Sequence, residues 1–176
     1  METMFDTTDA HPRDTLAGLQ VDAVAAYGNG RFSNFVAAKQ EFPTAHVLEI
    51  DVSGQGIGNA GDFEAGDMAY AHAGPWAKGR IEAGVSRPVI YFQVSSWQPV
   101  MESLEAAGVH RDHVRLWTAH YSGHPHLCSP ACGFGVTGTA DATQWGSPQA
   151  RGTLPGPYAS RNIDVSSTAA DFWGSR

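Results

Sequence analysis

Asp62 and Glu64, two acidic residues separated by a single position, offer the clearest acid–base chemistry in the chain. In an extended segment their side chains point to the same side of a sheet, and Phe63 points to the other. Neighbouring carboxyl groups rarely ionise with the same pKa, because each charge opposes the other. One can remain a protonated general acid while the other is a carboxylate, as cleavage of a glycosidic bond requires. The alternative is a turn, in which Asp67 caps a following helix.

Strand-like segments recur along the chain and would hold these side chains in place. Eight segments are rich in β-branched and aromatic residues or end in turn residues: 4–8, 21–27, 46–52, 62–64, 88–94, 114–121, 141–145 and 162–165. Helical spacing is present over 31–40, from Gly74 to Gly84 and over 97–107, and Asp171 to Trp173 looks like a docked tail. Gly54 to Gly61 is too short to contain a helix. Strands alternating with helical stretches predict a mostly parallel sheet.

The predicted fold class is α/β, a small irregular (β/α) TIM-like barrel with some helices missing. We expect one domain over residues 1–176, because a chain of this length suits a single core. The competing architecture is an open doubly wound sheet. In both architectures the active groups gather at the carboxyl ends of the strands.

Composition excludes several classes of partner. The net charge is −7 with 11 Lys plus Arg and no basic run, so we expect no nucleic-acid binding. No stretch approaches the roughly 20 apolar residues of a membrane span. The first residues lack a basic region followed by an apolar run, so we expect synthesis in the cytoplasm without a signal peptide.

Several short motifs follow one another in a fixed order along most of the chain. They are Asp6 at the end of the first strand, Asp62-Phe63-Glu64 followed by Gly66-Asp67, the Tyr-containing strand and Ser-x-Trp of 88–97, Leu116 to Tyr121, Thr143-Gln144-Trp145 and Asn162-Ile163-Asp164. In this order and spacing the chain resembles the glycoside hydrolase family 25 lysozymes. It is more closely similar to glycoside-hydrolase-like proteins of actinobacteria and phages.

The resemblance implies hydrolysis of the β-1,4 bond between N-acetylmuramic acid and N-acetylglucosamine in peptidoglycan, without a cofactor. Glu64 would be the general acid, and Asp62 would hold the acetamido group or stabilise the oxocarbenium-like transition state. Asp6 and Asp164 would line the same cleft. The residues implied to contact the sugars are Tyr91, Trp117, Tyr121, Gln144 and Trp145.

A protein with this resemblance would act at the cell wall or within a virion, with peptidoglycan glycan strands, or virion proteins, as partners. Two rival functions stay open. One is a non-catalytic wall-binding or phage structural (tail) protein on the same scaffold, since a fold does not establish an activity. The other is an Asp-rich, metal-dependent hydrolase. A serine nucleophile is a weaker idea, because the chain contains no Gly-x-Ser-x-Gly elbow.

A loop rich in His and Cys contains His124, His126, Cys128 and Cys132 and follows His120. The spacing His-x-Cys-x3-Cys is not a standard zinc-finger pattern. Three interpretations remain: a Cys128–Cys132 disulfide, a structural zinc site, or two ordinary thiols. The disulfide is our first expectation, and His124, His126 and the two cysteines are the candidate metal ligands.

Overall fold

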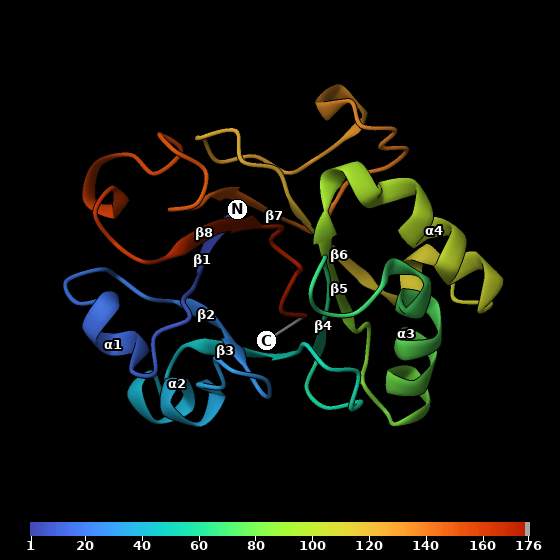
Figure 1. Cartoon of the computed structure of the whole chain (residues 1–176), viewed down its shortest axis with the longest axis horizontal. Helices are drawn as coiled ribbons and strands as arrows, with labels where there is room; N and C mark the ends of the chain where they lie inside the picture. Colours follow the sequence, from blue (N-terminus) through green and yellow to red (C-terminus); the bar gives the residue numbers. More distant parts are fainter. Residues whose placement is uncertain (175–176) are drawn as a thin grey trace.

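The computed structural model describes residues 1–174 and is built around eight strands that close into a barrel (Figure 1). The strands are β1 (Glu2–Asp6), β2 (Ala23–Tyr27), β3 (His46–Asp51), β4 (Ala60–Phe63), β5 (Val89–Gln93), β6 (Arg115–Ala119), β7 (Ala142–Gly146) and β8 (Asp164–Thr168). Strands β1 to β7 pair in parallel in chain order, and β8 lies antiparallel between β7 and β1. The eight predicted strands and the closed barrel are confirmed, and the open sheet is wrong.

Helices cover only part of the barrel. They are α1 (Pro12–Thr15), α2 (Phe35–Glu41), α3 (Ala73–Glu82) and α4 (Trp97–Ala106). Short 3₁₀ turns lie at Tyr70–His72, Val94–Ser96, Arg111–His113, Pro130–Cys132 and Gly156–Tyr158. Figure 1 shows α1 beside α2 on one side of the barrel and α3 beside α4 on the other. Residues 52–59 between β3 and β4, all described, contain no helix, as predicted. The long segments before β7 and β8 contain only single 3₁₀ turns.

Strand β5 shows how side-chain alternation divides the core into an inside and an outside. Ile90 and Phe92 point outward and pack in the cluster that includes α3 and α4. Tyr91 points inward and packs with Trp117 of β6, the residue beside it in the parallel register. The inner cluster is otherwise rich in alanine, which leaves room for these two large rings inside a narrow barrel.

The end of the barrel opposite the carboxyl ends of the parallel strands is closed by the C-terminal segment. Phe172 is 2% exposed and belongs to the inner cluster. The Trp173 ring stacks on His46 at the start of β3, with ring centroids 4.8 Å apart. The predicted docking of this tail is confirmed, and the opposite end is left for a site.

Helix α4 forms largely as its sequence predicts. Trp97, Val100 and Leu104 make its buried stripe. Gly108 ends it with φ +71°, and its amide donates to the carbonyl of Glu105 while the amide of Val109 donates to that of Leu104. These two bonds form the glycine-terminated cap that satisfies the last helical carbonyls.

The helix predicted over 31–40 is shifted. It begins at Phe35, after Asn34, whose side chain donates to the carbonyls of Thr7 and Asp9 and so ties this segment to the end of β1. Phe32 is 45% and Val36 68% exposed, and of the apolar residues at helical spacing only Phe35 packs against the outer cluster. Within residues 1–174 no helix is both long and apolar enough to span a membrane.

Candidate active site

The antiparallel direction of β8 brings the first and last predicted acidic residues together. Asp6 is the last residue of β1 and Asp164 is the first residue of β8, and the two are direct partners in the strand pairing. A parallel β8 would have placed Asp164 at the opposite end of the barrel, because it begins its strand. Asp62, in β4, and Glu64, just after that strand, reach the same end.

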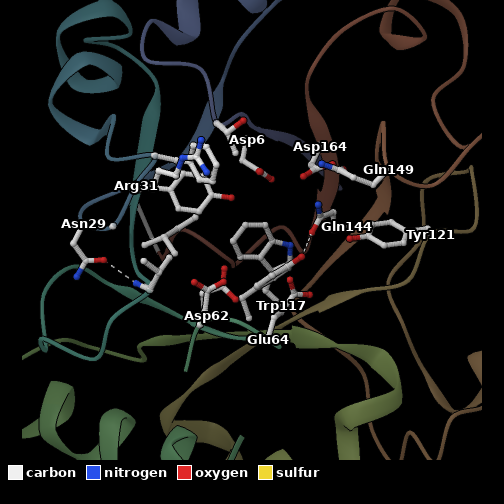
Figure 2. Close-up of a pocket in the computed structure, with 18 residues that line it drawn as sticks. Asp6, Asn29, Arg31, Asp62, Glu64, Trp117, Tyr121, Gln144, Gln149 and Asp164 are labelled. Atoms are coloured by element: carbon white, nitrogen blue, oxygen red, sulfur yellow. Dashed lines mark hydrogen bonds between the residues drawn. The ribbon is translucent and has the colours of Figure 1, made fainter. Parts of the chain in front are cut away.

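A cavity of about 440 Å³ occupies this end of the barrel. Eight of the nine predicted catalytic and sugar-contacting residues line it: Asp6, Asp62, Glu64, Tyr91, Trp117, Tyr121, Gln144 and Asp164. Figure 2 shows Asp6 with Asp164 on one side of the Trp117 indole and Asp62 with Glu64 on the other. The predicted convergence of acidic groups from distant strands is therefore present.

Asp6 and Asp164 resist carrying two charges at once. Burial raises the pKa of Asp6 well above its ordinary value, and the charges of Asp164, Asp62 and Glu64 raise it further. Burial also raises the pKa of Asp164 to about 6, although Ser147 and Gln144 offer hydrogen bonds that favour its charged form. This pair therefore retains a proton at a pH at which an exposed aspartate is ionised.

Asp62 and Glu64 differ in surroundings. Asp62 is 5% exposed, and burial followed by the charge of Glu64 raises its pKa well above the ordinary value. Burial also raises the pKa of Glu64, whereas the hydrogen bond from Gln93 opposes that shift. The amide of Gln93 donates to Glu64 Oε1 at 2.7 Å, so a proton on Glu64 belongs on Oε2.

Three carboxylate oxygens in this group are buried without a hydrogen-bond partner among the described residues. They are Oδ2 of Asp6, Oδ1 of Asp62 and Oδ1 of Asp164. Buried oxygens of this kind are rare in folded proteins and are costly to maintain. Together they make the cavity suited to a ligand that brings several hydroxyl or amide donors.

Aromatic rings form the floor of the cavity. The Tyr91 and Trp117 rings lie 4.5 Å apart between centroids, tilted by 54°. The Tyr91 hydroxyl donates to Gln144 Oε1, and Trp117 Nε1 donates to Ser166 Oγ at 3.0 Å. Tyr91 is 7% and Trp117 1% exposed, so these two rings form a fixed base, while the more exposed rings of Tyr27, Phe32 and Tyr121 also line the cavity.

Trp145 was predicted to contact sugars, and this prediction is wrong. Gln144 points into the barrel, so the next residue along β7 points outward. Trp145 is 3% exposed and packs in the outer cluster, with its ring centroid 6.4 Å from that of Tyr158. It supports the barrel wall from outside.

The structure adds residues that the sequence reasoning missed. Tyr27 ends β2 and lines the cavity, and the rule that strand ends gather at one mouth would have found it. Arg31 and Phe32 line the cavity from a loop, and Arg31 is its one basic side chain among the described residues. Their loop carries no motif that would have indicated this role.

Asp51 holds the glycine-rich link between β3 and β4 in place, a role that was not predicted from the sequence. Its buried carboxylate accepts hydrogen bonds from Asn29 Nδ2 at 2.7 Å, from Trp76 Nε1 at 3.0 Å and from the backbone amides of residues 53–57 at 2.8 to 3.4 Å. Burial alone would raise its pKa, but these bonds outweigh burial and lower it. The glycine-rich link therefore folds around an aspartate, beside the cavity residue Asn29.

The His/Cys loop is outside the cavity. Cys128 and Cys132 are both free thiols, so the expected disulfide is not formed. A ligand-like group does form, but it contains His120 in place of the predicted His124. His124 is exposed, and its ring faces the carbonyl of Ser122.

Comparison with known proteins gave no match to any protein-family model, to any curated protein or to any solved structure. The interpretation of the cavity therefore rests on its own residues.

Proposed function

We propose that this protein is a glycoside hydrolase that cleaves the β-1,4 bond between N-acetylmuramic acid and N-acetylglucosamine in peptidoglycan. The observation that carries the proposal is the gathering of four carboxyl groups, all with raised pKa values, over an aromatic floor in one cavity. Glycosidic cleavage needs an acid that is protonated near neutral pH and a second carboxylate beside it. The more exposed rings that line the cavity, those of Tyr27, Phe32 and Tyr121, supply flat surfaces for the apolar faces of sugars.

The barrel is best classified as a (β/α) barrel that has lost helices. Seven consecutive parallel strands support this class, as do the helices that precede β2, β3, β5 and β6. In such barrels the chemistry takes place at the carboxyl ends of the strands. The cavity lies at that end.

Glu64 is the proposed general acid. Gln93 holds Oε1, which leaves Oε2 to carry the proton toward the glycosidic oxygen. As the bond between the sugar carbon and that oxygen breaks, the proton passes to the departing sugar and positive charge develops on the remaining ring. Water then completes hydrolysis and returns a proton to Glu64.

Asp62, Asp6 and Asp164 assist the same step as hydrogen-bond acceptors or negative charges, whereas Glu64 donates the proton. Asp62 accepts a hydrogen bond from the acetamido group or faces the developing positive charge, which its unpartnered Oδ1 supports. Asp6 and Asp164 accept hydrogen bonds from sugar hydroxyls. The negative charge of Asp164 also raises the pKa of Glu64 and so keeps the acid protonated.

Mass spectrometry of wall digests tests this assignment. Purified bacterial walls are digested, the soluble products are reduced with borohydride, and the new chain ends are identified. The proposal predicts reduced N-acetylmuramic acid at those ends. Reduced N-acetylglucosamine would indicate a different glycosidic bond, and peptides released without new sugar ends would remove glycosidase activity. Binding to walls without any soluble product would favour the non-catalytic alternative.

A further inference from the structure

Four side chains with nitrogen or sulfur ligand atoms converge beside the barrel, outside the cavity. They are His120, His126, Cys128 and Cys132, and one ligand atom from each lies within 4.8 Å of all the others. His120 directly follows β6, and the remaining three belong to the long loop before β7. Cys128 is fully buried, whereas the other three are partly buried.

The distances among three of these atoms are close to the edges of a metal-centred tetrahedron. His120 Nδ1 lies 2.9 Å from His126 Nε2, and Cys128 Sγ lies 3.4 Å from the first nitrogen and 3.7 Å from the second. With usual zinc–nitrogen and zinc–sulfur bond lengths, tetrahedral geometry requires edges of about 3.3 Å between nitrogens and about 3.6 Å between nitrogen and sulfur. Three of the ligand atoms therefore lie within a few tenths of an ångström of these separations, and the Cys132 ligand atom lies within 4.8 Å of them, so small side-chain adjustments would bring all four to one ion.

The surrounding hydrogen bonds orient the ligand atoms. Nδ1 of His126 faces the carbonyl oxygen of His124 at 3.0 Å, so the proton belongs on Nδ1 and the lone pair of Nε2 faces the cluster. The backbone amide of Cys128 donates to Thr143 Oγ1 at 2.8 Å, and that of His120 donates to the carbonyl of Gln144 at 2.9 Å. Strand β7 thereby anchors two of the ligands.

A hydrogen bond between the imidazoles of His120 and His126 would explain why the two histidines lie together. It would leave unexplained why both cysteines of the chain converge on the same two nitrogens as unbridged thiols. Two thiolates with two neutral imidazoles form a donor set that zinc prefers. Four protein ligands leave no open position, which is the arrangement of a structural site and not of a catalytic one.

We propose that His120, His126, Cys128 and Cys132 bind a zinc ion that fastens the loop between β6 and β7 to the barrel. In a complete (β/α) barrel a helix would cover the barrel between β6 and β7. This segment contains only the short 3₁₀ turn Pro130–Cys132. The metal would join this turn to the end of β6. Tyr121, which lines the cavity, follows His120 directly, so the same ion would fix the position of its ring.

Metal analysis of the full chain, purified reduced and reconstituted with zinc, tests the proposal independently of any wall-cleaving activity. We expect close to one equivalent of zinc per chain. Replacement by cobalt should give the intense d–d bands and the thiolate charge-transfer band of a tetrahedral site with sulfur ligands. Cys132→Ser and His126→Gln should each lose most of this metal. His124→Gln is the matched control and should retain it, because the His124 side chain is outside the group.

Thermal unfolding supplies a second readout. A strong zinc chelator should lower the Tm of the wild type and of His124→Gln, and should leave that of a Cys128→Ser/Cys132→Ser double variant unchanged. Three results would each overturn the proposal: no bound metal in the reduced wild type, metal retained by the double variant, or a Cys128–Cys132 disulfide detected by mass in protein that was never exposed to oxidant. Metal retained by the double variant would instead indicate binding by the acidic cavity.

Discussion

Asp6 and Asp164 are cross-strand partners at the mouth of the barrel, although 157 positions separate them in the chain. One ends a strand and the other begins a strand, and only antiparallel pairing brings two such residues to the same end. Burial raises both pKa values, and the charge of Asp164 raises that of Asp6 further. This pair therefore links the closure of the barrel to the acid chemistry proposed for it.

The pair should tune the acid. The charge of Asp164 is one of the causes that raise the pKa of Glu64, so Asp164→Asn should lower that pKa. A general acid works only while protonated, and the alkaline limb of the pH–activity profile should therefore move to lower pH. The profile for soluble glycan hydrolysis measures this shift. An unchanged alkaline limb would mean that Asp164 does not act on the group that limits activity at high pH.

Stability should also depend on this pair. The folded pKa of Asp164, about 6, is above its ordinary value of 3.8, so the folded state binds more protons than the unfolded state between these values. The free energy of unfolding should therefore fall as pH rises through this window. Asp6, Asp62 and Glu64 are shifted in the same direction and extend the effect.

In Asp164→Asn this fall should be smaller, because Asn cannot ionise and no longer raises the pKa of Asp6. Urea denaturation of both proteins at a series of pH values from about 4 to about 7 measures the difference. Parallel curves for the two proteins would contradict the explanation.

Asp51 should be a major contributor to stability through its hydrogen bonds. Asp51→Asn keeps the shape of the side chain but turns one acceptor into a donor that faces Trp76 Nε1 or the loop amides. We expect a loss of at least about 3 kcal/mol in the free energy of unfolding, the scale of leaving buried donors unpaired. Asp112→Asn, at a side chain that is 82% exposed, is the matched control and should change little. Equal losses in the two variants would refute the role of Asp51.

The lowered pKa of Asp51 adds a pH signature with the opposite sign. Its stabilising contribution is present above the unfolded pKa and is lost as pH falls through the lower folded pKa. The difference in stability between wild type and Asp51→Asn should therefore shrink under strongly acidic conditions, below about pH 4.

Tyr121 should contribute its ring to sugar binding, whereas Trp145 should not. Calorimetric titration of soluble glycan into Glu64→Gln protein, which should bind without cleavage, measures affinity alone. Adding Tyr121→Ala should weaken binding about fivefold or more, the scale of losing one aromatic contact, and Tyr121→Phe should retain it. Trp145→Phe should leave the affinity unchanged, since this ring lies on the outer face of the wall. The reverse ranking would show that the cavity is not where glycan binds.

The strands and the shared face of Asp62 and Glu64 could be predicted for physical reasons, whereas the place of Asp6 and Asp164 beside them was implied by the resemblance. Segments such as 88–94, which is rich in β-branched and aromatic residues and has one polar residue, are best explained by a strand buried on both faces. Asp62 and Glu64 were placed on one side by the two-residue period of extended chain. Both features are local, and local patterns are legible in a single sequence.

Features set by tertiary structure could not be predicted in the same way. The residues of β8 do not encode whether the strand runs parallel or antiparallel, although the position of Asp164 depends on it. The choice of His120 over His124 depends on the path of the loop, which passes through a left-handed residue, Gly123, between the two histidines. The outward direction of Trp145 could have been predicted, because consecutive residues of a strand, here Gln144 and Trp145, face opposite sides of the sheet.

The rate of wall hydrolysis by Glu64→Gln, compared with that of the wild type, decides whether Glu64 is the acid of a carboxylate-lined sugar site. Glu82→Gln, the same change at an exposed residue of α3, is the matched control. We predict that Glu64→Gln lowers the rate at least about a hundredfold while glycan binding persists, and that Glu82→Gln has the wild-type rate. Hydrolysis by Glu64→Gln at the wild-type rate, or no hydrolysis by the wild type on any peptidoglycan tested, would contradict the account.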